Sequence, residues 1–140
     1  MPGKMPDKVA LDSSIIAAMF FKEDASERAL KAATEPDLIT LDLAFAEVGN
    51  VAWKQVVLSD VDKELTWMAL QKCMKFIFEA CDIVRSQDLA AEAYAISVDA
   101  RTTFYDSLFL ALAEKEQVPL LTLDRRMYEK AKGKMDVQLI

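Results

Sequence analysis

The chain has 140 residues, of which 53% are hydrophobic and 29% charged, a composition that predicts one globular domain over residues 1–140 and excludes a disordered chain. No apolar run approaches the ~20 residues needed to span a bilayer, and the N-terminal sequence MPGKMPDK lacks the apolar core of a signal peptide, so we expect a cytoplasmic protein without membrane contact. The formal net charge of −6 argues against a broad basic surface that coats nucleic acid, but it does not exclude a nuclease whose acids bind a divalent metal.

The chain contains no histidine and two cysteines, Cys73 and Cys81. Without histidine it lacks the usual base of a catalytic triad and the usual ligand of transition metals. Two thiols alone make a poor zinc site, and we interpret both cysteines as partly buried hydrophobic residues. Any metal would therefore be held by carboxylates, which favours Mg²⁺ or Mn²⁺.

The first informative stretch is Lys8–Ala18, KVALDSSIIAA. An apolar run ends on Asp12, and a second apolar run begins after two serines. This pattern predicts a short buried strand that leads into a helix over about residues 13–21. Ligands bind at the carboxyl ends of the strands in an open α/β sheet, which makes Asp12 a candidate site residue. The alternative is that Asp12 only caps the helix.

The next segments continue the alternation of helix and strand. The sequence Asp24–Glu27 resembles a capping box and predicts a second helix that continues to about Thr34, where Pro36 follows. Residues 37–41, DLITL, are typical of a second strand, and a third helix is predicted from about residue 42 to residue 58.

One stripe of the third helix mixes apolar and polar residues. Glu47 and Asn50 share this stripe with Leu43, Val51 and Lys54. A carboxylate among apolar residues is costly unless it has a partner, so Glu47 is a second candidate acid. The alternatives are that Glu47 faces solvent at the edge of the stripe or forms an ion pair with Lys54.

The middle of the chain contributes packing rather than chemistry. Residues 59–62, SDVD, are expected to cap a fourth helix that ends near Ala80, and residues 81–84 are a short strand. Ser86 is expected to cap a fifth helix. The apolar face of the fourth helix is interpreted as core or dimer packing; it contains Trp67, Leu70, Met74, Ile77 and Phe78. The acids expected to face solvent or cap helix ends are Asp82, Asp88 and Asp99.

A buried helix is predicted within residues 101–113, because this stretch is apolar nearly all round from Phe104 onward. The polar exceptions are Asp106 and Ser107. The sequence from Thr103 to Asp106 also fits a capping box, in which Asp106 would be a structural acid. The functional alternative is that Asp106 enters the helix on the side that faces the strand ends.

The C-terminal part repeats the arrangement of the first stretch. The apolar segment 120–123, LLTL, predicts a strand that ends on Asp124, and a basic helix follows from Arg125 to about Lys132. Residues 137–140 are a candidate last strand. Because strands alternate with helices throughout, we predict a three-layer α/β/α sandwich with a mainly parallel central sheet.

Four acids are expected to meet at one edge of this sheet. Asp12 and Asp124 follow strands, while Glu47 and Asp106 lie near the starts of helices, and these positions share the edge at which parallel strands end. Four carboxylates in one place repel each other unless a cation lies between them. A bound Mg²⁺ or Mn²⁺ ion would resolve the repulsion, activate water and stabilise charge on a reacting phosphate.

The order of these motifs resembles the PIN domain, and more narrowly the VapC-type toxins of prokaryotic toxin–antitoxin pairs. The resemblance rests on Leu-Asp12-Ser-Ser, Ala-Glu47-Val-Gly-Asn50-Val, Phe-Tyr-Asp106-Ser-Leu-Phe-Leu-Ala-Leu-Ala and Leu-Thr122-Leu-Asp124, and it covers nearly the whole chain. It implies the PIN-type sandwich and divalent-metal-dependent endonucleolytic cleavage of RNA. The residues that match the family's acidic quartet are Asp12, Glu47, Asp106 and Asp124.

The same resemblance implies supporting residues and partners. Ser14 and Thr122 match small hydroxyl positions that hydrogen-bond the acids, and Asn50 matches a polar position near the site. VapC-type proteins usually form homodimers, and a small VapB-type antitoxin inhibits them by inserting a basic side chain into the acidic pocket. Phosphate contacts are expected from the basic helix, through Arg125, Arg126 and Lys130.

Other functions fit the sequence less well. A haloacid-dehalogenase-like phosphatase would need a second acid where Ser14 stands, and a receiver domain would need an acidic pair and a late lysine that the sequence does not provide in place. A catalytically silent PIN-fold binding module and a PIN nuclease of RNA processing or quality control remain as alternatives.

Overall fold

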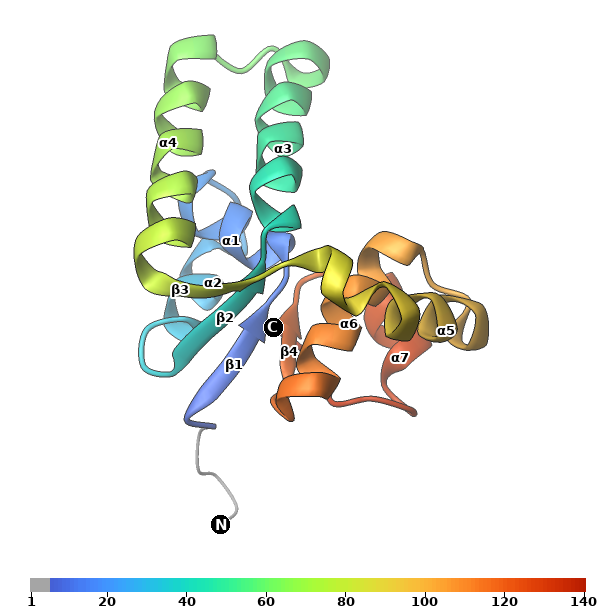
Figure 1. The fold of residues 1–140 in the computed structure, drawn as a ribbon. Coiled ribbons are helices and arrows are strands. Elements are labelled where there is room, and N and C mark those ends of the chain that lie inside the picture. Colours follow the sequence, from blue (N-terminus) through green and yellow to red (C-terminus); the bar gives the residue numbers. More distant parts are fainter. Residues whose placement is uncertain (1–5) are drawn as a thin grey trace.

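A computed structural model describes residues 6–140 of the chain as a sheet flanked by helices (Figure 1). The elements in chain order are β1 (Lys8–Leu11), α1 (Ser13–Phe20), α2 (Ser26–Ala32), β2 (Asp37–Leu41), α3 (Leu43–Ser59), α4 (Lys63–Ala80), β3 (Cys81–Val84), the 3₁₀ helix η1 (Ser86–Leu89), α5 (Ala90–Ala100), α6 (Phe104–Glu116), β4 (Leu120–Thr122), α7 (Arg125–Ala131) and β5 (Val137–Leu139).

The sheet has the strand order β3-β2-β1-β4-β5, and every neighbouring pair is parallel. The central strand β1 pairs with β2 on one side and β4 on the other, so that Ala10 lies opposite both Ile39 and Leu120. The chain moves outward from β1 in one direction through β2 and β3 and in the other through β4 and β5. The carboxyl ends of β1 and β4 therefore flank the topological switch point, which is the usual ligand site of such sheets.

Helices cover both faces of the sheet, which confirms the predicted α/β/α sandwich. Right-handed connections place α1 to α4 on one face and α5 to α7 on the other (Figure 1). In keeping with this, α1 contacts α2, α3 and α4, whereas α5 packs on α6. The helix α6 is buried along its length from Ser107 to Ala113, as its nearly uniform apolar sequence predicts.

Two predicted helix starts are wrong. The helix α2 begins at Ser26 without a side-chain cap, and its entry is fixed by the Ser26 hydroxyl, which accepts from the Glu23 amide. Asp24 therefore forms no capping box. Ser86 begins the short 3₁₀ helix η1 rather than capping an α-helix, and its amide donates to the Asp42 carboxylate, 44 residues away in sequence. At α2 a different local contact replaces the predicted cap, and at Ser86 a contact with a distant segment does so.

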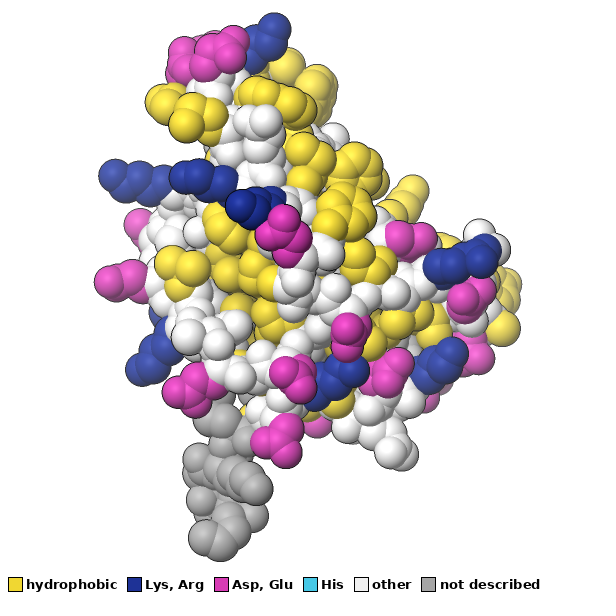
Figure 2. Space-filling view, turned by 60° about the vertical axis from the view of Figure 1, so that its left-hand side comes forward, with side chains coloured by type: hydrophobic (Ala, Val, Ile, Leu, Met, Phe, Trp, Pro, Cys, Tyr) yellow, Lys and Arg dark blue, Asp and Glu magenta, His cyan; other side chains and the backbone are white. Residues whose placement is uncertain are grey.

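The helices α3 and α4 form a hairpin that extends beyond the sheet (Figure 1), and its surface is more apolar than expected. Of the predicted α4 face, Ile77 is buried, but Trp67 and Phe78 are 49% and 63% exposed. Figure 2 shows hydrophobic side chains gathered on the side of the molecule that carries this hairpin. The core side of α4 is formed instead by Thr66, Cys73 and Ile77. Within residues 6–140, no helix combines the length and apolar composition needed to cross a membrane.

The cysteines behave as hydrophobic residues, as predicted. Cys73 is buried in the core and Cys81 is half-buried, and neither forms a disulfide. Burial raises the pKa of both thiols to about 12, so they stay protonated and unreactive near neutral pH.

Candidate active site

Asp12 is the most deeply buried acid of the predicted quartet. It follows β1 directly, and only 5% of its surface is exposed. Its Oδ1 atom accepts hydrogen bonds from the Ile15 amide at 3.2 Å and from the Ser14 hydroxyl at 2.6 Å. Asp12 is thus the N-cap of α1, and the same contacts fix its carboxylate at the carboxyl end of the central strand. Asp12 therefore caps the helix and also lies at the candidate site, so the two alternatives are compatible.

Two hydroxyls link the ends of β1 and β4. Thr122 donates to Oδ2 of Asp12 at 2.5 Å and accepts from the Asp124 amide at 3.0 Å. Ser14 donates to the same carboxylate and accepts from the Leu123 amide at 3.0 Å. Ser14 and Thr122 therefore occupy positions that hold one acid in place and orient the segment carrying the next.

Replacing the buried Thr122 with Val is expected to lower the free energy of unfolding by about 1–3 kcal/mol, because the Asp12 carboxylate loses a donor and the Asp124 amide loses an acceptor. Urea denaturation measures this change. Thr122→Ser keeps the hydroxyl and should retain most of the stability. Equal unfolding free energies for the wild-type protein and Thr122→Val would contradict the assigned role.

Asp124 and Asp106 occupy the starts of two helices. Asp124 caps α7 by accepting from the Met127 amide at 3.0 Å. Asp106 lies in the first turn of α6, where its amide donates to the Thr103 hydroxyl at 3.1 Å. The predicted cap at Thr103 is therefore present and uses the backbone amide of Asp106, while the half-buried Asp106 lines a pocket together with Asp124.

Glu47 is held by a contact that the sequence did not reveal. Its Oε1 atom accepts from the Ser13 hydroxyl at 2.8 Å, and so α3 is tied to the start of α1. The salt bridges among residues 6–140 do not include a pair between Glu47 and Lys54, which makes the ion-pair alternative wrong. No local signal in the sequence pointed to Ser13 as the partner of Glu47, because the two residues lie 34 positions apart.

The four acids lie near enough to influence each other. The pKa of Asp12 is raised to about 6. Burial is the main cause and the charge of Asp106 a smaller one, and the hydrogen bonds that stabilise the charged form oppose both. Burial also raises the pKa of Glu47, with added repulsion from Asp106 and Asp12. For Asp106, burial is again the first cause of a raised pKa, followed by the charge of Asp124. The charge of Asp106 therefore acts on Asp12 and Glu47, and Asp106 is itself repelled by Asp124.

The donor set fits a divalent cation in its chemistry. Four carboxylates provide the hard oxygen ligands that Mg²⁺ and Mn²⁺ prefer, and the salt bridges of the described residues involve none of the four. In the described part of the chain, however, no three acidic or thiol side chains form a ready-made metal site. The acids would have to approach each other more closely when they bind an ion.

Two pockets flank the acids. One, of about 330 Å³, is lined by Asp106, Asp124, Arg126 and Lys130 with parts of Thr102, Thr103 and Met127. The other, of about 400 Å³, lies beside Glu47 and is lined by Ser13, Leu43, Ala46, Asn50, Val51, Lys54 and Tyr105. Of the predicted basic residues, Arg126 and Lys130 lie at the acids, whereas Arg125 is exposed and does not line either pocket.

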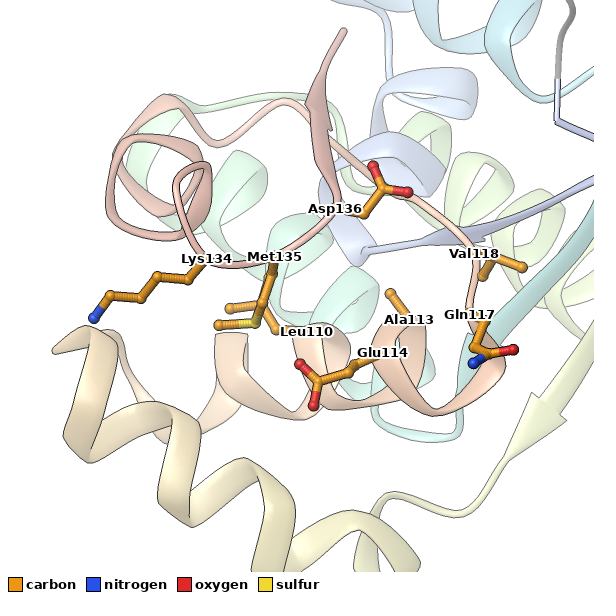
Figure 3. Close-up of a pocket in the computed structure, with 8 residues that line it drawn as sticks. All are labelled: Leu110, Ala113, Glu114, Gln117, Val118, Lys134, Met135 and Asp136. Carbon is orange, nitrogen blue, oxygen red and sulfur yellow. The ribbon is translucent and has the colours of Figure 1, made fainter. Parts of the chain in front are cut away.

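A third pocket lies at the opposite edge of the sheet. Its volume is about 360 Å³, and its walls come from the end of α6, the loop before β4 and the segment before β5 (Figure 3). Lys134 in this wall is engaged with Asp99 of α5. None of the candidate site residues lines this pocket, so the carboxyl edge remains the candidate site.

Comparisons with known proteins agree with the fold described above. The model of the PIN domain matches residues 9–133. Two proteins of Pyrobaculum aerophilum are similar: Ribonuclease VapC3, 36% identical over 88% of this chain and 94% of its own, and Exonuclease VapC9, 31% identical over 74% of each chain. Among solved structures, PAE2754 of Pyrobaculum aerophilum has a TM-score of 0.67 at 26% identity and covers 94% of this chain and 92% of its own. A toxin–antitoxin complex from Klebsiella pneumoniae has a TM-score of 0.64 at 21% identity, over 93% and 95% of the two chains.

Proposed function

The chain belongs to the PIN domain family, and from this premise we propose that it is a metal-dependent endoribonuclease and the toxin of a VapBC-type toxin–antitoxin pair. The observation that carries the proposal is the convergence of Asp12, Glu47, Asp106 and Asp124 at the switch point, where burial and mutual repulsion raise the pKa values of the first three. The similarity to a protein named Ribonuclease VapC3 supports RNA as the substrate.

Asp12, Asp106 and Asp124, with Glu47 beside them, would hold one or two Mg²⁺ or Mn²⁺ ions. When bound, such an ion supplies a Lewis acid and lowers the pKa of water. The buried Asp12 carboxylate is already oriented by Ser14 and Thr122, so little reorganisation is needed at that ligand.

The protein side chains also handle the proton and the phosphate. Glu47 is half-buried, has a raised pKa and accepts a hydrogen bond from Ser13. These properties suit a carboxylate that acts as general base and takes a proton from the attacking water. Arg126 and Lys130 border the pocket at Asp106 and Asp124, where they would contact a substrate phosphate. Their charges partly compensate the net negative charge of the chain.

An antitoxin is proposed as the protein partner, because one of the similar structures is a toxin–antitoxin complex. A VapB-type partner would insert a basic side chain among the four acids, as the family resemblance implies. A homodimer is proposed as well, and the exposed apolar surface of the α3–α4 hairpin, which includes Trp53 and Trp67, offers area for such contacts. A toxin that acts on cellular RNA would work in the cytoplasm.

Exonucleolytic cleavage is the second candidate, favoured by the 31% identity to a protein named Exonuclease VapC9. A circular single-stranded RNA separates the two reactions, since it has no end at which an exonuclease begins. Linearisation of the circle supports the endonuclease. Degradation of linear RNA alone would replace it with the exonuclease.

Metal dependence gives the direct test of the enzyme. A fluorogenic single-stranded RNA should be cleaved in the presence of Mg²⁺ or Mn²⁺ and stay intact with EDTA. Without RNA, the ion should raise the melting temperature, because a ligand at 100 times its Kd stabilises the folded state by ~2.7 kcal/mol. A binding module without catalysis would give no cleavage at any ion concentration.

A further inference from the structure

We propose that the pocket beside Glu47 binds the nucleobase next to the scissile phosphate, with the Tyr105 ring stacked on the base and the Asn50 amide hydrogen-bonded to its edge. This inference rests on the proposed ribonuclease function and names what the same site recognises in its substrate. We call this cavity of about 400 Å³ the Tyr105 pocket.

The Tyr105 pocket is continuous with the acidic site. Glu47 is part of its wall, and so is Ser13, which donates to the Glu47 carboxylate at 2.8 Å. Tyr105 is the residue immediately before Asp106 on α6. An RNA strand with its phosphate at the acids would therefore place an adjoining nucleotide in this pocket.

The side chains of the Tyr105 pocket match a base better than a phosphate. Tyr105 is 62% exposed at the start of α6, and a ring left in water beside an acidic site offers a stacking surface that every base accepts. Leu43 and Val51 provide apolar walls. Asn50 brings a donor and an acceptor in one amide, the combination needed to bind a base edge.

The hydrogen bonds and salt bridges of residues 6–140 do not engage the Asn50 amide or the Lys54 ammonium group. Both side chains are exposed at the pocket, so they are available to a ligand. Lys54 lies one turn beyond Asn50 on α3, where it would contact the phosphate on the far side of the bound nucleotide.

The two pockets that flank the acids differ in chemistry, which gives the bound strand a direction. The pocket at Asp106 and Asp124 carries two cationic side chains, Arg126 and Lys130, and no aromatic ring. The Tyr105 pocket carries one cation, an aromatic ring and an amide. The nucleotide on one side of the cleavage point is thus held by its phosphate, and the nucleotide on the other side by its base.

The test measures RNA binding without cleavage. A short single-stranded RNA carries the fluorescent base 2-aminopurine at one position at a time, and it is titrated with the Asp12→Asn protein in Mg²⁺. We expect quenching by stacking at one position. Adding Tyr105→Ala should abolish this quenching and raise the Kd ~5- to 150-fold, because stacking on an aromatic side chain is worth ~1–3 kcal/mol per base. Tyr105→Trp should retain both signals.

Tyr94→Ala is the matched control, because Tyr94 on α5 is equally exposed, at 65%, and does not line the pocket. It should leave Kd and quenching unchanged. An RNA with an abasic site at the quenched position should bind with equal Kd to the Asp12→Asn protein, called the parent below, and to the parent with Tyr105→Ala added. Asn50→Ala should change the preference among the four bases at that position more than it changes the mean Kd.

The proposal is overturned if the Tyr105→Ala protein binds every labelled RNA with the same Kd as the parent. It is also overturned if Tyr105→Ala weakens binding of the abasic RNA as much as binding of the intact RNA, or if no RNA binds. These outcomes are distinct from a failure of the proposed enzyme. A wild-type protein that shows the position-specific quenching but cleaves no RNA would remove the ribonuclease and leave the base pocket. A protein that cleaves normally after Tyr105→Ala would remove the pocket and leave the ribonuclease.

Discussion

Replacing Asp106 with Asn is expected to reduce RNA cleavage by about 10³-fold, the loss that corresponds to several kcal/mol of transition-state stabilisation. The charge of Asp106 repels Asp12 and Glu47, and Asp106 is repelled by Asp124, so it interacts with each of the other three acids. Removing its charge weakens the attraction for a divalent ion more than removing any acid at the margin of the group. The loss should appear in kcat at saturating RNA and should be only partly restored by higher Mg²⁺.

The fold should tolerate this change. The amide of Asp106, which donates to Thr103, is retained in Asn, and the side chain makes no salt bridge among the described residues. Circular dichroism of the variant should match the wild-type protein in EDTA, and its melting temperature should equal or exceed that of the wild type, because burial and the charge of Asp124 raise the pKa of Asp106 and asparagine stays neutral. Asp88→Asn, on the exposed 3₁₀ helix η1, removes the same charge away from the site and should cleave normally. A fully active Asp106→Asn protein would exclude Asp106 from the site.

The sequence was sufficient to predict the sheet and the edge where the acids lie. Asp12 and Asp124 each end a short apolar run, and such runs with a helix on either side form parallel strands whose carboxyl ends share an edge. Glu47 was identified by a different signal, a carboxylate within an apolar stripe. These signals are local patterns in the sequence. The elements that they predict form unless tertiary contacts favour a different structure.

Contacts between distant segments could not be predicted in the same way. The Ser13 hydroxyl reaches Glu47 and not Asp12, although both serines follow the same strand, and the choice depends on where α3 packs. Tyr105 was interpreted only as part of an apolar helix, since the sequence does not show that α6 begins in solvent. Exposure of an aromatic residue is a property of the packed structure, and that exposure carries the inference about base binding.

The apolar face of α4 was predicted to serve core or dimer packing, and only part of it lies in the core. Helical periodicity identified a face, but the hairpin of α3 and α4 extends beyond the sheet (Figure 1), so only part of that face meets other elements. Cys73 and Ile77 are buried, whereas Trp67 remains half-exposed. Large hydrophobic side chains that the monomer leaves in water are typical of surfaces that bind other proteins.

The Asp12→Asn protein is expected to be more stable than the wild-type protein at pH 7.5 in EDTA. The pKa of Asp12 is about 6 in the folded protein against an ordinary value of 3.8, because burial penalises the charged form. Well below the ordinary pKa of 3.8 the carboxyl is protonated in both states and does not affect stability. As the pH rises from 3.8 to about 6, the unfolded state ionises while the folded carboxyl stays protonated, so stability falls, and above pH 6 the loss levels off at about 3 kcal/mol. Asparagine avoids this loss because it stays neutral.

The contacts of Asp12 allow the substitution. An asparagine oxygen still accepts from the Ile15 amide and the Ser14 hydroxyl, and its amide group faces the Thr122 hydroxyl, which has lone pairs to accept it. We expect a rise in melting temperature of roughly 5–10 °C at pH 7.5 and a difference near zero at about pH 3, below the ordinary pKa of the carboxyl. Mg²⁺ should raise the melting temperature of the wild-type protein more than that of the variant, which keeps three of the four acids, and so narrow the gap. A wild-type protein more stable than the variant at pH 7.5 in EDTA would show that Asp12 is not strained by its own charge. Burial of Asp12 would then provide no electrostatic reason for a cation to bind at the switch point.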